Sequence, residues 1–304
     1  MRGHPDKEFA VELVINRVIP MSDTPRVDPA QKRPARAPRV PLKSCFDPAN
    51  KWEIGVDEAG RGPLFGRLYV AGTIVPRLTG GADEAINANC PGLGNGMNAE
   101  ARPEFRHDWM KDSKRFSSEK KIREVADHIR ANSVAYTVRY LDHDVIDAIN
   151  IRQAVLRLMR ECCGAMLARI RELDPECDVA RDVLLVIDGN DFPIMTMFER
   201  DELIQVRHET VEKGDNTYCS VAAASILAKV ARDDYIAAVC AAHPGLDERY
   251  GLLSNKGYGT KRHLDGIRAH GISEWHRKSY RIKSIGDGGI DSHSDCGTLN
   301  GVQF

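Results

Sequence analysis

Four acidic residues occupy positions at which they could act together in chemistry. Asp57 and Glu58 end a short apolar segment, WEIGVDE, and Asp188 ends another, VLLVID. Asp233 lies further along the chain, within a segment of helical spacing. Because the carboxyl ends of strands line the site in an open α/β sheet, we expect acids at such ends to meet. A single acid of this kind is more often an exposed loop carboxylate, so the hypothesis depends on the apolar run before Asp188.

Clustered carboxylates repel one another and need a cation. Oxygen ligands without Cys or His favour Mg²⁺ or Mn²⁺. Two such ions, about 4 Å apart, activate water and stabilise the leaving oxygen in phosphodiester cleavage. No protein nucleophile is then required, and the sequence shows no His or Ser motif for covalent catalysis. The acids therefore predict metal-dependent hydrolysis of a phosphodiester.

Asp233 shares one predicted helix face with Ser225 and Lys229. The three residues are spaced four apart, so they follow one side of a helix of ~3.6 residues per turn. A Lys beside a metal-binding Asp can pair with it or with a substrate phosphate. The alternative is an ordinary ion pair, worth about 0.3–0.5 kcal/mol, and the spacing alone does not choose between them.

Two glycine-rich turns could contact a nucleic acid. Gly60-Arg61-Gly62 follows the first two acids, and glycine lets backbone groups approach a ligand closely. A ribose 2′-hydroxyl both donates and accepts hydrogen bonds, so exposed backbone there could distinguish RNA from DNA. Tyr258, in KGYGT, could stack on a sugar or a base. Both signals are weak alone, because Gly-x-Gly turns are common and loop tyrosines are more often packed.

The apolar pattern predicts strands and helices in alternation around these residues. The expected strands are WEIGVDE, 67–75, 133–141, 183–188 and 204–210. The expected helices are 117–131 (capped by Ser117), 151–173, 220–240 and a short one around 261–270. Such alternation is typical of an α/β layered domain.

The 304 residues suffice for one large domain or two small ones. Residues 1–50 are predicted to be a flexible basic extension, because residues 31–43 hold five basic residues, three prolines and no acid. The simpler interpretation is a solvated linker. The functional alternative is an arm that binds phosphates or a nuclear-targeting patch. Residues 51–284 are the expected catalytic domain, with a surface loop at 79–105. Residues 285–304 are predicted to be a disordered tail.

Bulk composition excludes few partners. A formal net charge of -1 neither supports nor excludes a nucleic-acid substrate. The eight cysteines form no CxxC pair, so free thiols in a reducing compartment are expected. No apolar run approaches ~18 residues, which predicts no membrane span. Without a secretory pattern at the start, we expect a cytoplasmic, nucleoid-associated protein, or a nuclear one in a eukaryote or virus.

Seven segments, in order, resemble the type 2 ribonuclease H (ribonuclease HII) family. They are GVDEAGRGPLFG (55–66), DSK (112–114), IDAINIRQA (146–154), VIDGN (186–190), KGDNTYCSVAAASILAKVARD (213–233), NKGYGTKRH (255–263) and HGISEWHRKSY (270–280). The similarity runs from about residue 52 to about residue 283. One motif alone would be a moderate indication, whereas seven in the family's order are a strong one.

The resemblance implies a ribonuclease H-like fold: a central mixed sheet flanked by helices, with a helical C-terminal part. It implies hydrolysis of the RNA strand of RNA–DNA hybrids and cutting 5′ to single ribonucleotides embedded in duplex DNA, with Mg²⁺ or Mn²⁺ as cofactor and a monomeric enzyme. The metal-binding catalytic acids would be Asp57, Glu58, Asp188 and Asp233. Substrate would be bound by Gly60, Arg61, Gly62, Lys114 and Tyr258. Asp234 adjoins Asp233, and the match of ARD to the motif favours Asp233.

Three alternatives remain at this stage. A ribonuclease HIII would carry a folded N-terminal substrate-binding domain and a Gly-Lys-Gly-like turn, but the first 50 residues are short and polar. A non-catalytic hybrid-binding module would tolerate loss of acids, yet all four are present. Another nuclease or an integrase on the same core would not need the GRG and KGY elements. The C-terminal GTLNGVQF shows no sliding-clamp-binding pattern, so no protein partner is predicted.

Overall fold

The computed structural model describes residues 41–77 and 105–282. The chain divides into two units, Met1–Val40 and Pro41–Phe304, and the described residues all belong to the second. Most of the predicted extension, the 79–105 loop and the 285–304 tail lie outside the described residues, so their flexibility stays a prediction. Residues 41–50, expected in the extension, contact the folded unit: Lys43 N donates to Thr217 O (2.8 Å) and Phe46 N to Glu53 Oε2 (2.8 Å).

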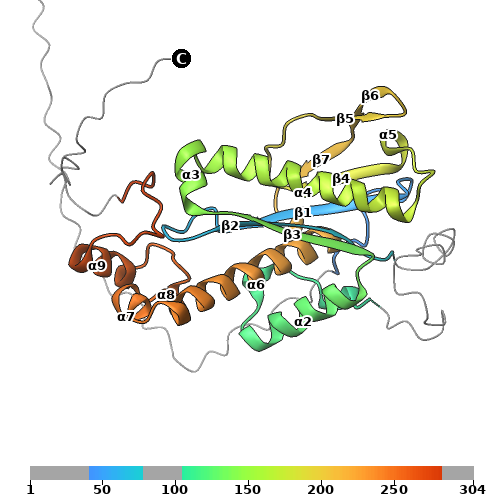
Figure 1. Cartoon of the computed structure of the whole chain (residues 1–304). Helices are drawn as coiled ribbons and strands as arrows, with labels where there is room; N and C mark the ends of the chain where they lie inside the picture. Colours follow the sequence, from blue (N-terminus) through green and yellow to red (C-terminus); the bar gives the residue numbers. More distant parts are fainter. Residues whose placement is uncertain (1–40, 78–104, 283–304) are drawn as a thin grey trace, which may run out of the picture. The chain divides into compact units, whose positions relative to one another are not determined.

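A mixed sheet forms the centre of the described unit, with strand order β3-β2-β1-β4-β7 (Figure 1). β2 pairs antiparallel with β1 and β3, whereas β4 pairs parallel with β1 and β7. β5 and β6 form a separate hairpin. The strands are β1 (Trp52–Ala59), β2 (Leu68–Ile74), β3 (Ala135–Leu141), β4 (Val183–Asp188), β5 (Met195–Glu199), β6 (Glu202–Val206) and β7 (His208–Val211).

Helices cover both faces of this sheet. α4 lies on one face, α6 and α2 lie on the other, and α7 to α9 gather beyond the end of α6 (Figure 1). The helices are α2 (Glu119–Asn132), α3 (His143–Ile149), α4 (Ile151–Leu173), α5 (Val179–Asp182), α6 (Cys219–Ala242), α7 (Leu246–Tyr250), α8 (Leu252–Asn255) and α9 (Lys261–His270). This confirms the predicted fold class, including the helical C-terminal part.

The short elements α3, α5, β5, α7 and α8 were not predicted from the sequence, and two predicted details differ. The cap of α2 is Ser118, whose side chain accepts from Lys121 N, and not Ser117. The single strand expected at 204–210 is two strands that pair with different partners, β6 with β5 and β7 with β4. The chain changes partner at Arg207, and an apolar pattern cannot show such a change because both strands continue the same alternation.

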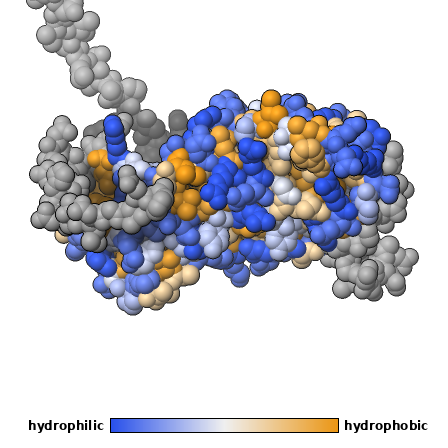
Figure 2. All heavy atoms as spheres, turned by 45° about the horizontal axis from the view of Figure 1, so that its top comes forward, coloured by the Kyte–Doolittle hydropathy of each residue, from blue (hydrophilic) through white to orange (hydrophobic). Residues whose placement is uncertain are grey.

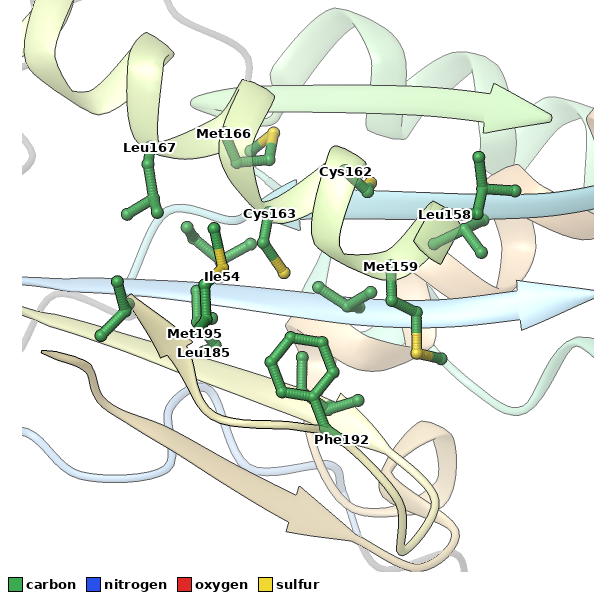
Figure 3. Packing of buried hydrophobic residues seen from close by; sticks show 14 of the residues in the cluster. Ile54, Leu158, Met159, Cys162, Cys163, Met166, Leu167, Leu185, Phe192 and Met195 are labelled. Atoms are coloured by element: carbon green, nitrogen blue, oxygen red, sulfur yellow. The ribbon is translucent and has the colours of Figure 1, made fainter. Parts of the chain in front are cut away.

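Residue alternation along β1 sends its side chains to two different layers. Ile54 and Val56 pack in the cluster beneath α4, where Met159, Cys163 and Met166 point towards the strands (Figure 3). Gly55 faces α6, and a Cβ there would lie 2.3 Å from the main-chain carbon of Ser220. Glycine at this position therefore lets α6 lie directly against β1.

Four described cysteines, Cys162, Cys163, Cys177 and Cys240, are free thiols, and burial raises the pKa of Cys163 well above its ordinary value. No described helix has the length and apolar character needed to cross a membrane.

Hydrophilic and hydrophobic residues are intermixed over the face shown in Figure 2. Exposed large apolar side chains occur on and beside the β5–β6 hairpin, among them Phe198 and Leu203, which pair across its two strands.

Candidate active site

Asp57 and Glu58 lie near the carboxyl end of β1. Asp57 is buried against α6, where the Ser225 hydroxyl donates a hydrogen bond to its carboxylate. The Ser225 hydroxyl in turn lies 3.0 Å from the hydroxyl of Ser113, in the DSK segment. The second motif of the sequence is therefore connected to the first through Ser225 of α6, which contacts an acid directly.

Asp188 ends β4, the parallel neighbour of β1. Val56 is paired with Ile187, so the next residues of the two strands, Asp57 and Asp188, emerge side by side. The main-chain N–H of Gly214 donates to Asp188 Oδ1 at 2.7 Å. The strand ends thus bring together three of the four predicted acids, as their positions after apolar runs indicated.

A further acid, Asp215, lies beside these three and was not singled out from the sequence. It is buried in the short 3₁₀ turn Gly214–Asn216, which directly precedes α6. The Asn216 side chain donates to Asp215 Oδ1 (3.0 Å) and to Asp112 Oδ2 (3.3 Å), so the turn also contacts the DSK segment. The available signal was the KGD segment within the fifth motif, in which the acid follows no apolar run.

The acid cluster, defined as Asp57, Glu58, Asp188 and Asp215, is electrostatically unfavourable by itself. Burial raises the pKa of Asp57 well above its ordinary value, and the charges of Asp188 and Glu58 raise it further. Burial and Asp188 likewise raise the pKa of Glu58. Burial together with Asp112 and Asp188 raises the pKa of Asp215 to about 6. Such shifts arise when like charges share a dehydrated site, and they mark a place that favours a cation.

Lys114 is the cation that the DSK segment contributes to this cluster. Burial opposes its charge, but Asp215, Asp112 and Asp57 together raise the pKa of Lys114 above its ordinary value. Its own charge lowers the pKa of Asp188, although burial of that carboxyl outweighs the effect. The structure therefore places the predicted phosphate-binding lysine among the acids, where it remains protonated.

Asp233 lies elsewhere on α6. It forms an ion pair with Lys229 (Nζ to Oδ2, 2.7 Å), about 12 Å along the helix axis beyond Ser225. The groups that chiefly shift the pKa values of Asp57, Glu58 and Asp188 do not include Asp233. The structure thus forms the ordinary ion pair that the sequence left as an alternative, and it does not bring Asp233 into the acid cluster.

The side chains of the acid cluster are too far apart to share one metal ion in the arrangement seen here. Within residues 41–77 and 105–282, no three His, Cys, Asp or Glu side chains are arranged to hold a metal ion as they stand. The donor set nevertheless consists of carboxylate oxygens, the chemistry that Mg²⁺ and Mn²⁺ prefer. The residues therefore fit a divalent cation in donor type and charge, and their side chains must draw together to share one.

The Gly60-Arg61-Gly62 turn adjoins the cluster. Gly60 has φ +99°, and a Cβ there would lie 2.6 Å from Arg232 Nε and 2.8 Å from the carbonyl oxygen of Arg67. Glycine is required at this position by both conformation and space. The Arg61 guanidinium lies 3.8 Å from Glu58 Oε1, at the edge of the acid cluster.

Tyr258 completes this side of the site. Its side chain is half exposed, and its ring lies 3.6 Å from where a Cβ of Gly62 would be. The guanidinium of buried Arg232 lies 5.8 Å from the ring centroid. The structure therefore brings together the two glycine-rich turns that the sequence placed in separate motifs, with a half-exposed tyrosine beside the first turn.

The fold and the site define a class: an α/β protein with a carboxylate cluster at the carboxyl ends of two parallel strands. The sequence model of the family Ribonuclease HII matches residues 94–283. The chain is 34% identical to Ribonuclease HII of Parabacteroides distasonis over 232 residues (76% of this chain, 90% of that one). It is 32% identical to Ribonuclease HII of Psychrobacter sp. over 272 residues (80% and 84%).

Among solved structures, the chain is similar to one described as the PCNA:RNase HII complex from Archaeoglobus fulgidus, with 23% identity, a TM-score of 0.47 and coverage of 76% of this chain and 96% of that one. The family match and the curated relatives establish that the chain belongs to the ribonuclease HII family. Its activity is accordingly that of a ribonuclease H-type endonuclease.

Proposed function

We propose that this ribonuclease HII binds Mg²⁺ or Mn²⁺ between Asp57, Glu58, Asp188 and Asp215 and cuts next to ribonucleotides in duplexes. The resemblance assigned the fourth position to Asp233, but the mutual repulsion within the acid cluster supports Asp215. Bound there, a pair of divalent ions would activate water and stabilise the leaving oxygen. The observation that carries the proposal is this group of buried acids whose charges are not balanced by Lys114 and Arg61.

The protein groups around the cations have separate tasks. Ser225 and the main chain of Gly214 donate hydrogen bonds to the carboxylates of Asp57 and Asp188, which limits the orientations that these side chains can take as they draw together on a cation. Lys114 stands among the acids with its charge retained, and we assign it to a phosphate of the cleaved strand. The backbone of Gly60 and Gly62 supplies hydrogen-bonding groups for a 2′-hydroxyl, with Tyr258 packing on the same sugar.

The proposed substrates are RNA–DNA hybrids and duplex DNA that contains single ribonucleotides. In the second kind, the resemblance to the family implies cutting on the 5′ side of the ribonucleotide, and only one ribose is then available to the turn and to Tyr258. We also propose a monomeric enzyme of the cytoplasm that acts at the nucleoid, with the basic residues of the extension available to phosphates.

A labelled duplex with one embedded ribonucleotide tests this function. With Mg²⁺ or Mn²⁺ we expect one incision 5′ to the ribonucleotide, none in the matched all-DNA duplex, and none when EDTA is present. A hybrid with a continuous RNA strand should be cut at many positions. Equal cutting of the all-DNA duplex would refute ribose recognition, and full activity in EDTA would refute the metal site.

A further inference from the structure

Two histidines are buried in contact with each other behind Tyr258. His263, on α9, and His276 are both almost completely inaccessible to solvent, and their Nε2 atoms lie 3.0 Å apart. The rings of Phe65 and Tyr250 pack edge-on against His276, at centroid distances of 5.1 and 4.9 Å. Neither histidine belongs to the acid cluster or to the residues proposed to contact substrate.

The hydrogen bonds of the pair permit one arrangement of protons. The main-chain N–H of Ser273 donates to His276 Nδ1 (2.9 Å), so that nitrogen carries no proton. A neutral His276 then carries its proton on Nε2 and donates to His263 Nε2. His263 must therefore carry its proton on Nδ1, from which it donates to the carbonyl oxygen of Tyr258 at 2.9 Å. Burial, with the neighbouring His263, lowers the pKa of His276 to about 3, which keeps the ring neutral.

Arg277, which follows His276, binds the loop that continues from the Gly60-Arg61-Gly62 turn. The main-chain N–H of Arg277 donates to Leu64 O (2.8 Å), and its guanidinium donates to Gly66 O (2.9 Å) and Pro63 O (3.0 Å). These carbonyls belong to the loop that follows the Gly60-Arg61-Gly62 turn. Consecutive side chains, His276 and Arg277, thus connect Tyr258 on one side with that loop on the other.

We propose that His263 and His276 are positioning residues for ribose recognition: a buried imidazole pair of fixed tautomers that sets the main chain of Tyr258 relative to the Gly60-Arg61-Gly62 turn. The inference rests on the proposed role of Tyr258 and deepens it. The last hydrogen bond of this series runs from His263 Nδ1 to the carbonyl oxygen of Tyr258. Loss of that bond therefore frees the loop that carries Tyr258, while the acid cluster stays in place. Cleavage at a single ribonucleotide, where one sugar carries all of the recognition, is the activity that suffers most.

The tautomers can be observed without any substrate. In protein labelled with ¹⁵N-histidine, long-range ¹H–¹⁵N correlation spectra at pH 7 should show His263 protonated on Nδ1 and His276 on Nε2, assigned with His263→Gln and His276→Gln. Protons on Nε2 of both rings, or a protonated imidazolium at either position, would overturn the proposed arrangement whatever the enzyme's activity.

Two substitutions of His263 separate its two bonds. Asn places a donor near the Nδ1 position and can keep the bond to Tyr258, whereas Gln reaches the Nε2 position and loses it. We expect His263→Gln to lower kcat/KM on the single-ribonucleotide duplex about tenfold and His263→Asn by about threefold or less. His270→Gln, an exposed change on the same helix, is the control and should have no effect.

A double-mutant cycle with Tyr258→Ala decides whether His263 acts through the tyrosine. If it does, adding His263→Gln to Tyr258→Ala lowers kcat/KM no further. A full additional loss in that background refutes the positioning role, while the proposed function stands. If Tyr258→Ala alone leaves the rate unchanged, the proposed role of Tyr258 fails instead. Thermal unfolding of each variant identifies losses that come from misfolding.

Discussion

The acid cluster and the loop that bears the Gly60-Arg61-Gly62 turn lie next to each other, but their buried charges are treated differently. The charges of the cluster repel one another, whereas a buried charge beside the loop is hydrogen bonded. The cluster holds buried carboxyls that raise one another's pKa values. The loop packs on buried arginines, and Arg277 satisfies its guanidinium with main-chain carbonyls. The first region is destabilised until a cation joins it, whereas the second is fixed before substrate arrives.

This difference shows where each part of the function is located. Charges of one sign in a dehydrated site cost stability, and a protein retains them where they bind something. A loop whose carbonyls are already bound has little freedom, which suits recognition of a sugar by shape and hydrogen bonds. Substitutions should therefore have opposite consequences in the two regions: loss of activity without loss of stability in the cluster, and loss of both in the loop.

Asp188→Asn should give the largest effect. We expect cleavage to fall roughly a thousandfold or more, because a cation ligand is lost. The thermal midpoint measured in EDTA should stay the same or rise, since one repelling charge has been removed. A variant that retains full cleavage would remove Asp188 from the metal site, and an unfolded variant would contradict the contrast between the regions.

Asp215→Asn and Asp233→Asn compare the two candidates for the fourth metal-binding acid. We expect roughly a hundredfold loss of cleavage for Asp215→Asn, since it belongs to the acid cluster. For Asp233→Asn we expect a change of about threefold or less and a stability loss of about 1 kcal/mol, because it only breaks the pair with Lys229. Cleavage rates and urea unfolding of both variants are the measurements, and the reverse order of activities would restore Asp233 as the fourth acid.

Gly60→Ala probes the rigid loop. The side chain meets the φ of +99° and the Arg232 side chain, so we expect a stability loss of about 1–3 kcal/mol and about tenfold weaker cleavage at single ribonucleotides. Gly164→Ala, in α4, is the matched control: nothing lies within 4 Å of its new Cβ, and it should stabilise by about 0.5–1 kcal/mol. Equal stability of the two variants would show that the turn is not constrained.

Asp147→Asn tests the anchor of the segment that carries Arg277. Burial opposes the charge, but hydrogen bonds from Ser279 and from the main chain of Lys278 lower the pKa of Asp147 overall. A lowered pKa stabilises the fold above the ordinary value of 3.8, and this contribution is lost as the pH falls through the folded-state pKa.

We therefore expect Asp147→Asn to cost about 1 kcal/mol or less at pH 7, given its partial exposure, and to differ less from the wild type near pH 3. Urea unfolding at both pH values measures this difference. A cost that does not depend on pH would mean that the charge of Asp147 contributes nothing.

The sequence by itself determined the long helices, the strands at the centre of the sheet and three of the acids. α4 and β4 begin and end at the predicted residues, because apolar periodicity is a local property that can be read from neighbouring residues alone. Asp57, Glu58 and Asp188 could be expected together, since strand ends follow directly from the same pattern. Only the tertiary structure decided the rest.

Asp215 lies in a short irregular turn, and Asp233 has helical spacing that does not show how far along α6 the cluster lies. The contact of Tyr258 with the Gly60-Arg61-Gly62 turn and the proton order of His263 and His276 depend on segments distant in sequence. Spacing fixes which residues share an element, whereas packing alone fixes which elements share a site.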